Sequence, residues 1–116
     1  MTSTHRSHGH TLTKGAGVRG KMSVLQGRAT GSNGGKGGSM HIAHFSVGML
    51  GANGVAAAGL PIACGAAHAL KIQRRPQVVA CFFGDGAINR SPIVSVIDLG
   101  MIWPWYLSLI HISEPT

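Results

Sequence analysis

Polar and hydrophobic positions divide this chain into a polar start, a glycine-rich middle and an apolar second half. Residues 1–17 are rich in His, Ser, Thr and Gly and predict a loop or a ragged start of the chain. Apolar residues recur at helical spacing over residues 18–26, which predicts a short helix. Residues 27–39, GRATGSNGGKGGS, predict either an ordered glycine loop or a flexible linker.

The longest apolar stretch covers residues 55–72, where Ala, Gly, Val, Leu, Ile and Cys occupy almost every position. A helix that is apolar on every side is a buried one, so we expect this helix to be buried all round. Asn53 is a candidate cap for it. Pro61 should either kink the helix or mark its true first turn.

A short apolar run follows, QVVACFF at residues 77–83, and predicts a strand buried on both faces. Gly84, Asp85 and Gly86 then turn the chain, and a second helix is expected over residues 91–102. Helix, continuous apolar strand, turn and helix in this order predict an α/β fold with a parallel sheet and flanking helices.

Composition narrows the class of protein. The chain has 116 residues, 44% of them hydrophobic, which suits one packed domain and disfavours global disorder. Its formal net charge of +7 favours an anionic partner, such as nucleic acid, a membrane surface or a phosphorylated small molecule. The basic residues are spread from Arg6 to Arg90 without a dense run, so charge alone does not choose among these partners.

The cysteines and the absence of apolar segments indicate the compartment. Cys64 and Cys81 both lie among apolar residues, which favours buried free thiols in a reducing environment. The sequence MTSTHRSHGH has no apolar core of a signal peptide, and no stretch of about twenty apolar residues exists. We therefore expect a cytoplasmic protein without a membrane segment.

The turn after the predicted strand is the strongest candidate for chemistry. Open α/β sheets bind ligands just outside the carboxyl ends of their strands, and a helix start there favours phosphate. Asp85 would repel a phosphate unless a cation lay between them, and Mg²⁺ is the natural bridge. The residues therefore point to a metal-bound diphosphate, while a common Asp-Gly surface turn is the competing interpretation.

Several motifs in register resemble one family. GDGAINR, which begins at Gly84, resembles the first half of the thiamine diphosphate motif. Upstream, THRSHGHTLTKG and GRATGSNGGKGGSMHIAHFSVGMLGANG resemble the alpha subunits of thiamine diphosphate-dependent dehydrogenases that act on acetoin and, at greater distance, on pyruvate. The resemblance covers about residues 3–103 and implies a fragment of the thiamine diphosphate-binding fold.

The resemblance also implies roles near the diphosphate. Asp85 would ligate Mg²⁺, and Gly86 and Ala87 would lie close to the diphosphate. Arg6 would donate to a cofactor phosphate as a charged donor, although a solvated Arg is the simpler interpretation of that residue alone.

Other positions are implied to lie elsewhere along the cofactor. His5 stands where the pyruvate branch has a tyrosine that touches the cofactor. Gly54 and Ala56 match backbone positions beside the aminopyrimidine ring, and residues 34–38 would belong to a loop nearby.

The family's activity defines the expected function. The resemblance implies an oxidoreductase subunit that cleaves acetoin, or decarboxylates a 2-oxo acid such as pyruvate, and passes the acyl group to the lipoyl group of an acyltransferase. It also implies a heterotetramer with a beta subunit, which supplies the glutamate that activates the cofactor. The alternative is a small basic module that binds nucleic acid. Only 5% of the residues are aromatic, and these do not alternate with Lys or Arg, which disfavours that alternative.

The end of the chain departs from the family. LSLIHISEPT, residues 107–116, resembles letter for letter the translation of a transposon-end adapter used to prepare sequencing libraries. We therefore expect residues 1–103 to form a partial thiamine diphosphate-binding domain and residues 104–116 to be a non-native tail. The asparagine pair that completes the metal motif would then be missing. Such a fragment should be inactive and marginally folded, because the apolar strand would lack neighbours.

Overall fold

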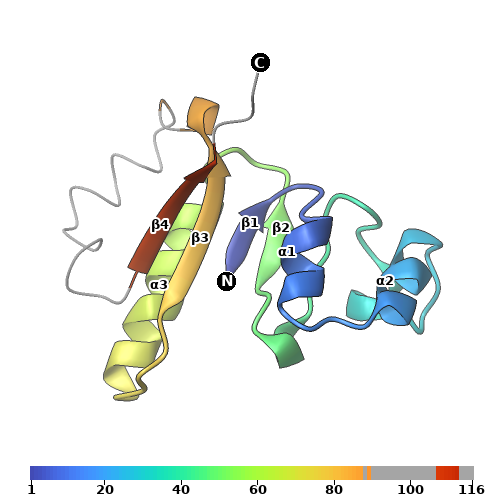
Figure 1. The fold of residues 1–116 in the computed structure, drawn as a ribbon, viewed down its shortest axis with the longest axis horizontal. Helices are drawn as coiled ribbons and strands as arrows, with labels where there is room; N and C mark the ends of the chain where they lie inside the picture. Colours follow the sequence, from blue (N-terminus) through green and yellow to red (C-terminus); the bar gives the residue numbers. More distant parts are fainter. Residues whose placement is uncertain (88, 90–106, 113–116) are drawn as a thin grey trace. The chain divides into compact units, whose positions relative to one another are not determined.

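The computed structural model describes residues 1–87, 89 and 107–112, the last range as backbone only. The chain divides into two compact units. The sheet unit comprises Met1–Thr2 and Val55–Thr116, and the glycine unit comprises Ser3–Gly54. Each unit is described by itself below (Figure 1).

The sheet unit is built on parallel strands. β3 (Val79–Gly84) pairs with β4 (Leu107–Ile112) over its whole length, from Val79 opposite Leu107 to Gly84 opposite Ile112. On its other side β3 pairs in parallel with the start of β1 (Thr2–Thr4), where Thr2 lies opposite Cys81. Figure 1 shows α3 (Gly59–Ile72) behind β3 and β4. The predicted parallel sheet with a flanking helix is confirmed.

α3 begins later, and is buried less, than the sequence predicted. Its first residue is Gly59, and Ala58 occupies the cap position, so the prediction that Asn53 caps the helix is wrong. Pro61 lies in the first turn of α3, which confirms the second of the two expectations for this residue, a kink or a first-turn position. The expectation of burial on every side is also wrong, because Ile62 is 46% exposed and Ile72 68%.

The core of the sheet unit lies between one face of α3 and one face of β3. Leu60, Ala63, Cys64 and Ala67 are the buried residues of α3, and they pack with Val79, Cys81, Phe83 and Ala87. Along β3, buried and partly buried positions alternate. The prediction of a strand buried on both faces therefore holds fully for only one face. Both cysteines are free and buried, as predicted.

β3 has neighbours on both sides, so the expectation that it would lack them is wrong for this structure. The neighbour β4 is formed by residues of the adapter-like segment. The pairing shows that residues 107–112 adopt a strand. It does not bear on the resemblance of these residues to an adapter, which concerns where the sequence came from. The predicted second helix over residues 91–102 lies outside the described residues.

The polar start of the chain is not the predicted loop. It forms β1 and then α1 (His8–Thr13), in which Thr11 Oγ1 donates to the Ser7 carbonyl oxygen at 2.9 Å. The hydroxyl of Ser3 and Nδ1 of His10 lie 2.8 Å apart. The predicted helix over residues 18–26 is confirmed as α2 (Val18–Leu25).

The remaining elements of the glycine unit are short. η1 (Ser32–Gly35) and η2 (Phe45–Val47) are single turns, and β2 (Gly51–Asn53) is a three-residue strand. Of the two interpretations of residues 27–39, the ordered loop is correct. Arg28 N donates to the Ser23 carbonyl oxygen at 2.9 Å, and Gly31 N to that of Arg28 at 2.9 Å.

Close approach explains two of the glycines in this loop. A Cβ on Gly31 would lie 2.4 Å from the backbone nitrogen of Val24 in α2. A Cβ on Gly35, whose φ is +75°, would lie 2.4 Å from the carbonyl oxygen of Arg28.

Within the described part of the chain, no helix is long and apolar enough to cross a membrane.

Candidate cofactor site

The turn that follows β3 presents the one described carboxylate. β3 ends at Gly84, and Asp85–Ala87 form the single turn η3. Asp85 is exposed, and it is the only Asp or Glu among the described residues. The turn stands at the carboxyl end of a strand whose neighbours are parallel, which is where open α/β sheets bind ligands.

The core fixes the far side of this turn. Ala87 is 6% exposed and belongs to the cluster formed by α3 and β3, so it anchors the turn. Gly86 is exposed, and a Cβ built there would meet nothing within 4 Å. The turn therefore offers a carboxylate and an open stretch of backbone to solvent. That combination fits a hard cation that bridges to phosphate oxygens, with water as its further ligands.

The described residues supply only part of a metal site. No three side chains of the His, Cys, Asp or Glu type gather in the described regions at a spacing that could hold a metal ion. Asp85 would therefore contribute one ligand, and the rest would come from the diphosphate, from water and from other residues.

Backbone strain lies beside another predicted position. Ala57 has a φ of +68° and is 3% exposed, whereas its neighbour Ala56 is exposed. A side chain in the left-handed region costs about 1 kcal/mol. Such strain persists where the surrounding structure enforces it, and it is concentrated at functional sites. The bend at Ala57 holds Ala56 on the surface just before α3 begins.

His5 and Arg6 occupy the connection between β1 and α1, and both are exposed. Arg6 has a φ of +59°, and its carbonyl oxygen accepts from His8 N at 2.7 Å in a tight turn. Like Ala57, Arg6 is therefore a strained residue at or beside a predicted cofactor position. Its guanidinium is available to an anion from solvent.

A buried lysine and a histidine adjoin this turn, and no sequence motif assigned a role to either of them. Lys21 of α2 is 9% exposed and donates to the carbonyl oxygen of His8 at 2.7 Å. Nε2 of His8 lies 2.9 Å from the Ser39 hydroxyl. Burial, and then the positive charges of Lys21 and Arg6, lower the pKa of His8, so its imidazole is neutral near pH 7.

Gly54 lies against a residue that sequence reasoning also missed. A Cβ on Gly54 would stand 2.9 Å from Cε1 of His41, so the imidazole occupies the space beside the glycine backbone. The carbonyl oxygen of His41 accepts from Asn33 Nδ2 at 3.0 Å, which ties His41 to the glycine loop. Both residues lie in the stretch GRATGSNGGKGGSMHIAHFSVGMLGANG, but the motif does not show which of its residues contact each other.

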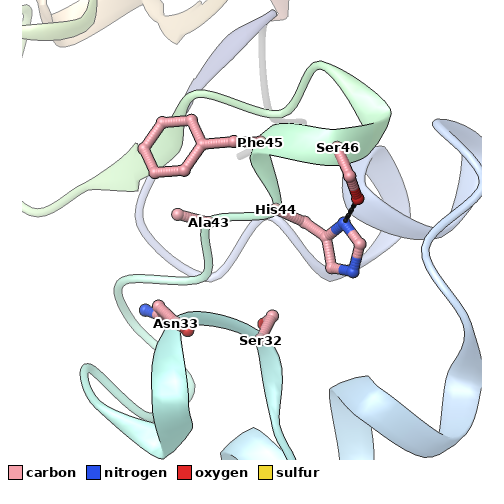
Figure 2. A pocket seen from close by; sticks show the side chains of 6 residues that line it. All are labelled: Ser32, Asn33, Ala43, His44, Phe45 and Ser46. Atoms are coloured by element: carbon pink, nitrogen blue, oxygen red, sulfur yellow. Dashed lines mark hydrogen bonds between the residues drawn. The ribbon is translucent and has the colours of Figure 1, made fainter.

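The glycine loop also borders a cavity of about 220 Å³ (Figure 2). Nδ1 of His44 lies 3.0 Å from the Ser46 hydroxyl, and the Phe45 side chain is 72% exposed. The hydroxyl of Ser32 is buried and finds no hydrogen-bond partner among the described residues. The six residues that line this cavity are Ser32, Asn33, Ala43, His44, Phe45 and Ser46.

The predicted site residues fall into two sets, one in each unit. The sheet unit contains Ala56 and, in the turn η3, Asp85, Gly86 and Ala87. His5, Arg6 and Gly54 belong to the glycine unit, where His5 and Arg6 are adjacent and Gly54 contacts His41.

A parallel sheet with a flanking helix places this chain among the α/β proteins, which bind ligands at the carboxyl ends of their strands. Comparison with known proteins identifies the family within that class. The family of dehydrogenase E1 components matches residues 1–114, and the chain belongs to it. The resemblance read from the sequence is thereby confirmed.

Individual relatives agree with this assignment. The alpha subunit of acetoin:2,6-dichlorophenolindophenol oxidoreductase from Bacillus subtilis (strain 168) is 48% identical over 114 residues, which are 98% of this chain and 34% of the relative. The protein of that name from Cupriavidus necator is 46% identical over 103 residues, 89% of this chain and 31% of the relative. The alpha subunit of the pyruvate dehydrogenase E1 component from Porphyra purpurea is 38% identical over 121 aligned positions, 98% of this chain and 35% of the relative. The chain thus spans about a third of the length of these relatives.

Proposed function

We propose that this chain is part of the alpha subunit of a thiamine diphosphate-dependent dehydrogenase component. The observation that carries the proposal is the exposed Asp85 in a turn at the carboxyl end of a parallel strand, within a chain of the dehydrogenase E1 family. The cofactor would be thiamine diphosphate bound through Mg²⁺. Nothing in the family assignment supports the alternative of a nucleic-acid-binding module.

Each predicted residue of the sheet unit would have a distinct task in cofactor binding. Asp85 would hold Mg²⁺ through its carboxylate, and the open backbone at Gly86 would let the turn approach phosphate oxygens. Ala87 would keep the turn in place through its burial in the core. Ala56 would lie on the surface beside the aminopyrimidine ring.

The glycine unit would supply the remaining contacts. Arg6 would donate charged hydrogen bonds to a phosphate, and His5 beside it would touch the cofactor. Gly54 would bring its backbone close to the aminopyrimidine ring, with His41 filling the space on one side. The bound cofactor would supply the carbanion chemistry that cleaves a C–C bond next to a carbonyl.

The similarity to the relatives supports a choice of substrate. Acetoin is the first choice, because the relatives named for acetoin are 46–48% identical to this chain while the Porphyra purpurea pyruvate dehydrogenase subunit is 38% identical. Pyruvate is the second. The whole enzyme would pair this subunit with a beta subunit, transfer the acyl group to a lipoyl-bearing acyltransferase, and work in the cytoplasm.

The proposal is tested in the intact alpha–beta assembly by replacing one ligand. Asp85→Ala should weaken thiamine diphosphate binding about 100-fold in the presence of Mg²⁺, because the metal loses a protein carboxylate. Isothermal titration calorimetry measures this change. Arg19→Gln, which alters an exposed charge on α2, serves as the matched control and should leave the affinity as it is. Equal affinity in the Asp85→Ala and unmodified proteins would refute the proposal.

A further inference from the structure

His41 presents an exposed imidazole from a backbone that is held on both sides. Its amide nitrogen donates to the Gly37 carbonyl oxygen at 3.2 Å, and its own carbonyl oxygen accepts from Asn33 Nδ2 at 3.0 Å. Both bonds use the main chain of His41, so they fix where the side chain starts without occupying the ring. The glycine unit therefore offers this ring to solvent from an ordered point.

Two glycines leave room for His41 and for nothing larger than hydrogen beside it. A Cβ on Gly37 would lie 2.8 Å from Cβ of His41 and 2.9 Å from its carbonyl oxygen. A Cβ on Gly54 would lie 2.9 Å from Cε1 of the imidazole and 3.6 Å from Nε2. The neighbouring backbone thus limits how far the imidazole can turn.

The imidazole is also what makes a side chain at position 54 unfavourable. The φ of Gly54 lies outside the left-handed region, so its backbone conformation does not itself require glycine. A larger residue there would meet the ring of His41 instead. Gly54 and His41 therefore form one local arrangement, in which a bare stretch of backbone and a histidine ring lie side by side.

We propose that His41 is a further cofactor-binding residue, whose imidazole forms a hydrogen bond with the aminopyrimidine ring of thiamine diphosphate. The inference rests on the proposed function, in which the backbone of Gly54 lies close to that ring. A ligand that approaches Gly54 meets the imidazole on one side, because the imidazole fills that space. A neutral imidazole has one donating and one accepting nitrogen, and an aminopyrimidine offers both an amino group and ring nitrogens. Since the imidazole is already restricted, little side-chain entropy is lost when the bond forms.

Calorimetry on the intact alpha–beta assembly, with Mg²⁺ present, separates the two ends of the cofactor. Thiamine diphosphate carries the aminopyrimidine ring, whereas inorganic pyrophosphate carries only the phosphate groups. His41→Ala should weaken the binding of thiamine diphosphate about tenfold, since one hydrogen bond to the ring is lost. Pyrophosphate should bind equally well to His41→Ala and to the unmodified protein, because it has no group that reaches the imidazole.

Two further variants serve as controls. His41→Gln keeps a donor and an acceptor on the side chain, so it should restore part of the affinity for thiamine diphosphate that His41→Ala loses. Asp85→Ala acts at the other end of the cofactor and should weaken the binding of both ligands, since each is held through Mg²⁺. Partial unfolding of His41→Ala cannot mimic the expected result, because it would reduce the binding of both ligands alike.

Four outcomes would overturn the inference. Unchanged affinity of His41→Ala for thiamine diphosphate, in a protein that responds to Asp85→Ala, would remove His41 from the site and leave the proposed function in place. An equal loss for pyrophosphate would assign the effect to the diphosphate end or to the fold. A His41→Gln protein that binds no better than His41→Ala would show that the contact is not a hydrogen bond. If neither ligand responds to Asp85→Ala, the proposed function fails, and the inference fails with it.

Discussion

The close approach of Gly31 to α2 gives a sharp test of whether the glycine loop is fixed. In Gly31→Ala the new Cβ would lie 2.4 Å from the backbone nitrogen of Val24 and 2.6 Å from its Cα. These distances are about 1 Å shorter than ordinary van der Waals contact. Val24 is fully buried, so neither α2 nor the loop can yield without disturbing its packing.

Overpacking of this kind costs about 1–3 kcal/mol. We expect a value near the upper end, about 3 kcal/mol, because the atoms that clash belong to the backbone of a helix and cannot rotate away. The φ of Gly31 lies outside the left-handed region, so steric overlap alone causes the loss.

Gly20→Ala is the matched control within α2. A Cβ at Gly20 meets nothing within 4 Å, and alanine is the better helix former. This variant should therefore gain about 0.5 kcal/mol. Both substitutions add one methyl group to the same unit, yet they should move stability in opposite directions.

Thermal unfolding followed by circular dichroism measures both effects. For a domain of this size the melting temperature of Gly31→Ala should fall by more than about 10 °C, while that of Gly20→Ala should rise by about 2 °C. If the two variants melt within about 2 °C of each other, residues 27–39 are not packed against α2. The flexible linker would then be the correct description of the glycine loop.

Two further predictions concern the sheet unit. Thr2 Oγ1 donates to the Gly59 carbonyl oxygen at 3.1 Å. Thr2→Val keeps the shape of the side chain and removes the donor, so it should lower the free energy of unfolding in urea by about 1 kcal/mol. An unchanged urea midpoint would show that the hydrogen bond does not stabilise the fold. Burial raises the pKa of the Cys64 and Cys81 thiols above that of an exposed cysteine, so they stay protonated in the folded protein when the unfolded chain ionises. The contribution of the two thiols to the free energy of unfolding should therefore be fully present below about pH 8 and decline as the pH rises past 9. The double variant Cys64→Ala, Cys81→Ala should show a smaller decline in urea unfolding. An equal decline in both proteins would assign it to other groups.

Elements with a clear apolar period could be predicted from the sequence, and those held by side-chain hydrogen bonds could not. α2 and β3 followed from helical spacing and a short apolar run. α1 did not, because its residues are polar and one of its stabilising bonds joins the Thr11 hydroxyl to the Ser7 backbone. α3 was placed correctly at its end but not at its start, where Ala57 adopts a left-handed conformation that no apolar pattern reveals.

The candidate site shows a similar division. Asp85 and its turn could be proposed from the sequence, because three consecutive residues carry the motif and the strand before it is apolar. The contact of His41 with Gly54 and the burial of Lys21 depend on how irregular loops fold back, which no helical or strand period encodes. Lys21 is charged, and such residues are rarely buried, so a sequence argument places it in solvent.

The ladder between β3 and β4 is made of main-chain hydrogen bonds, and every residue except proline can contribute to such a ladder. Many different sequences could therefore pair with β3, provided that their backbone is extended and long enough. In the same position an unoccupied edge would be a template for other chains. β4 occupies that edge of β3 and is the last strand of the described sheet on this side, so the edge open to another chain is that of β4 itself.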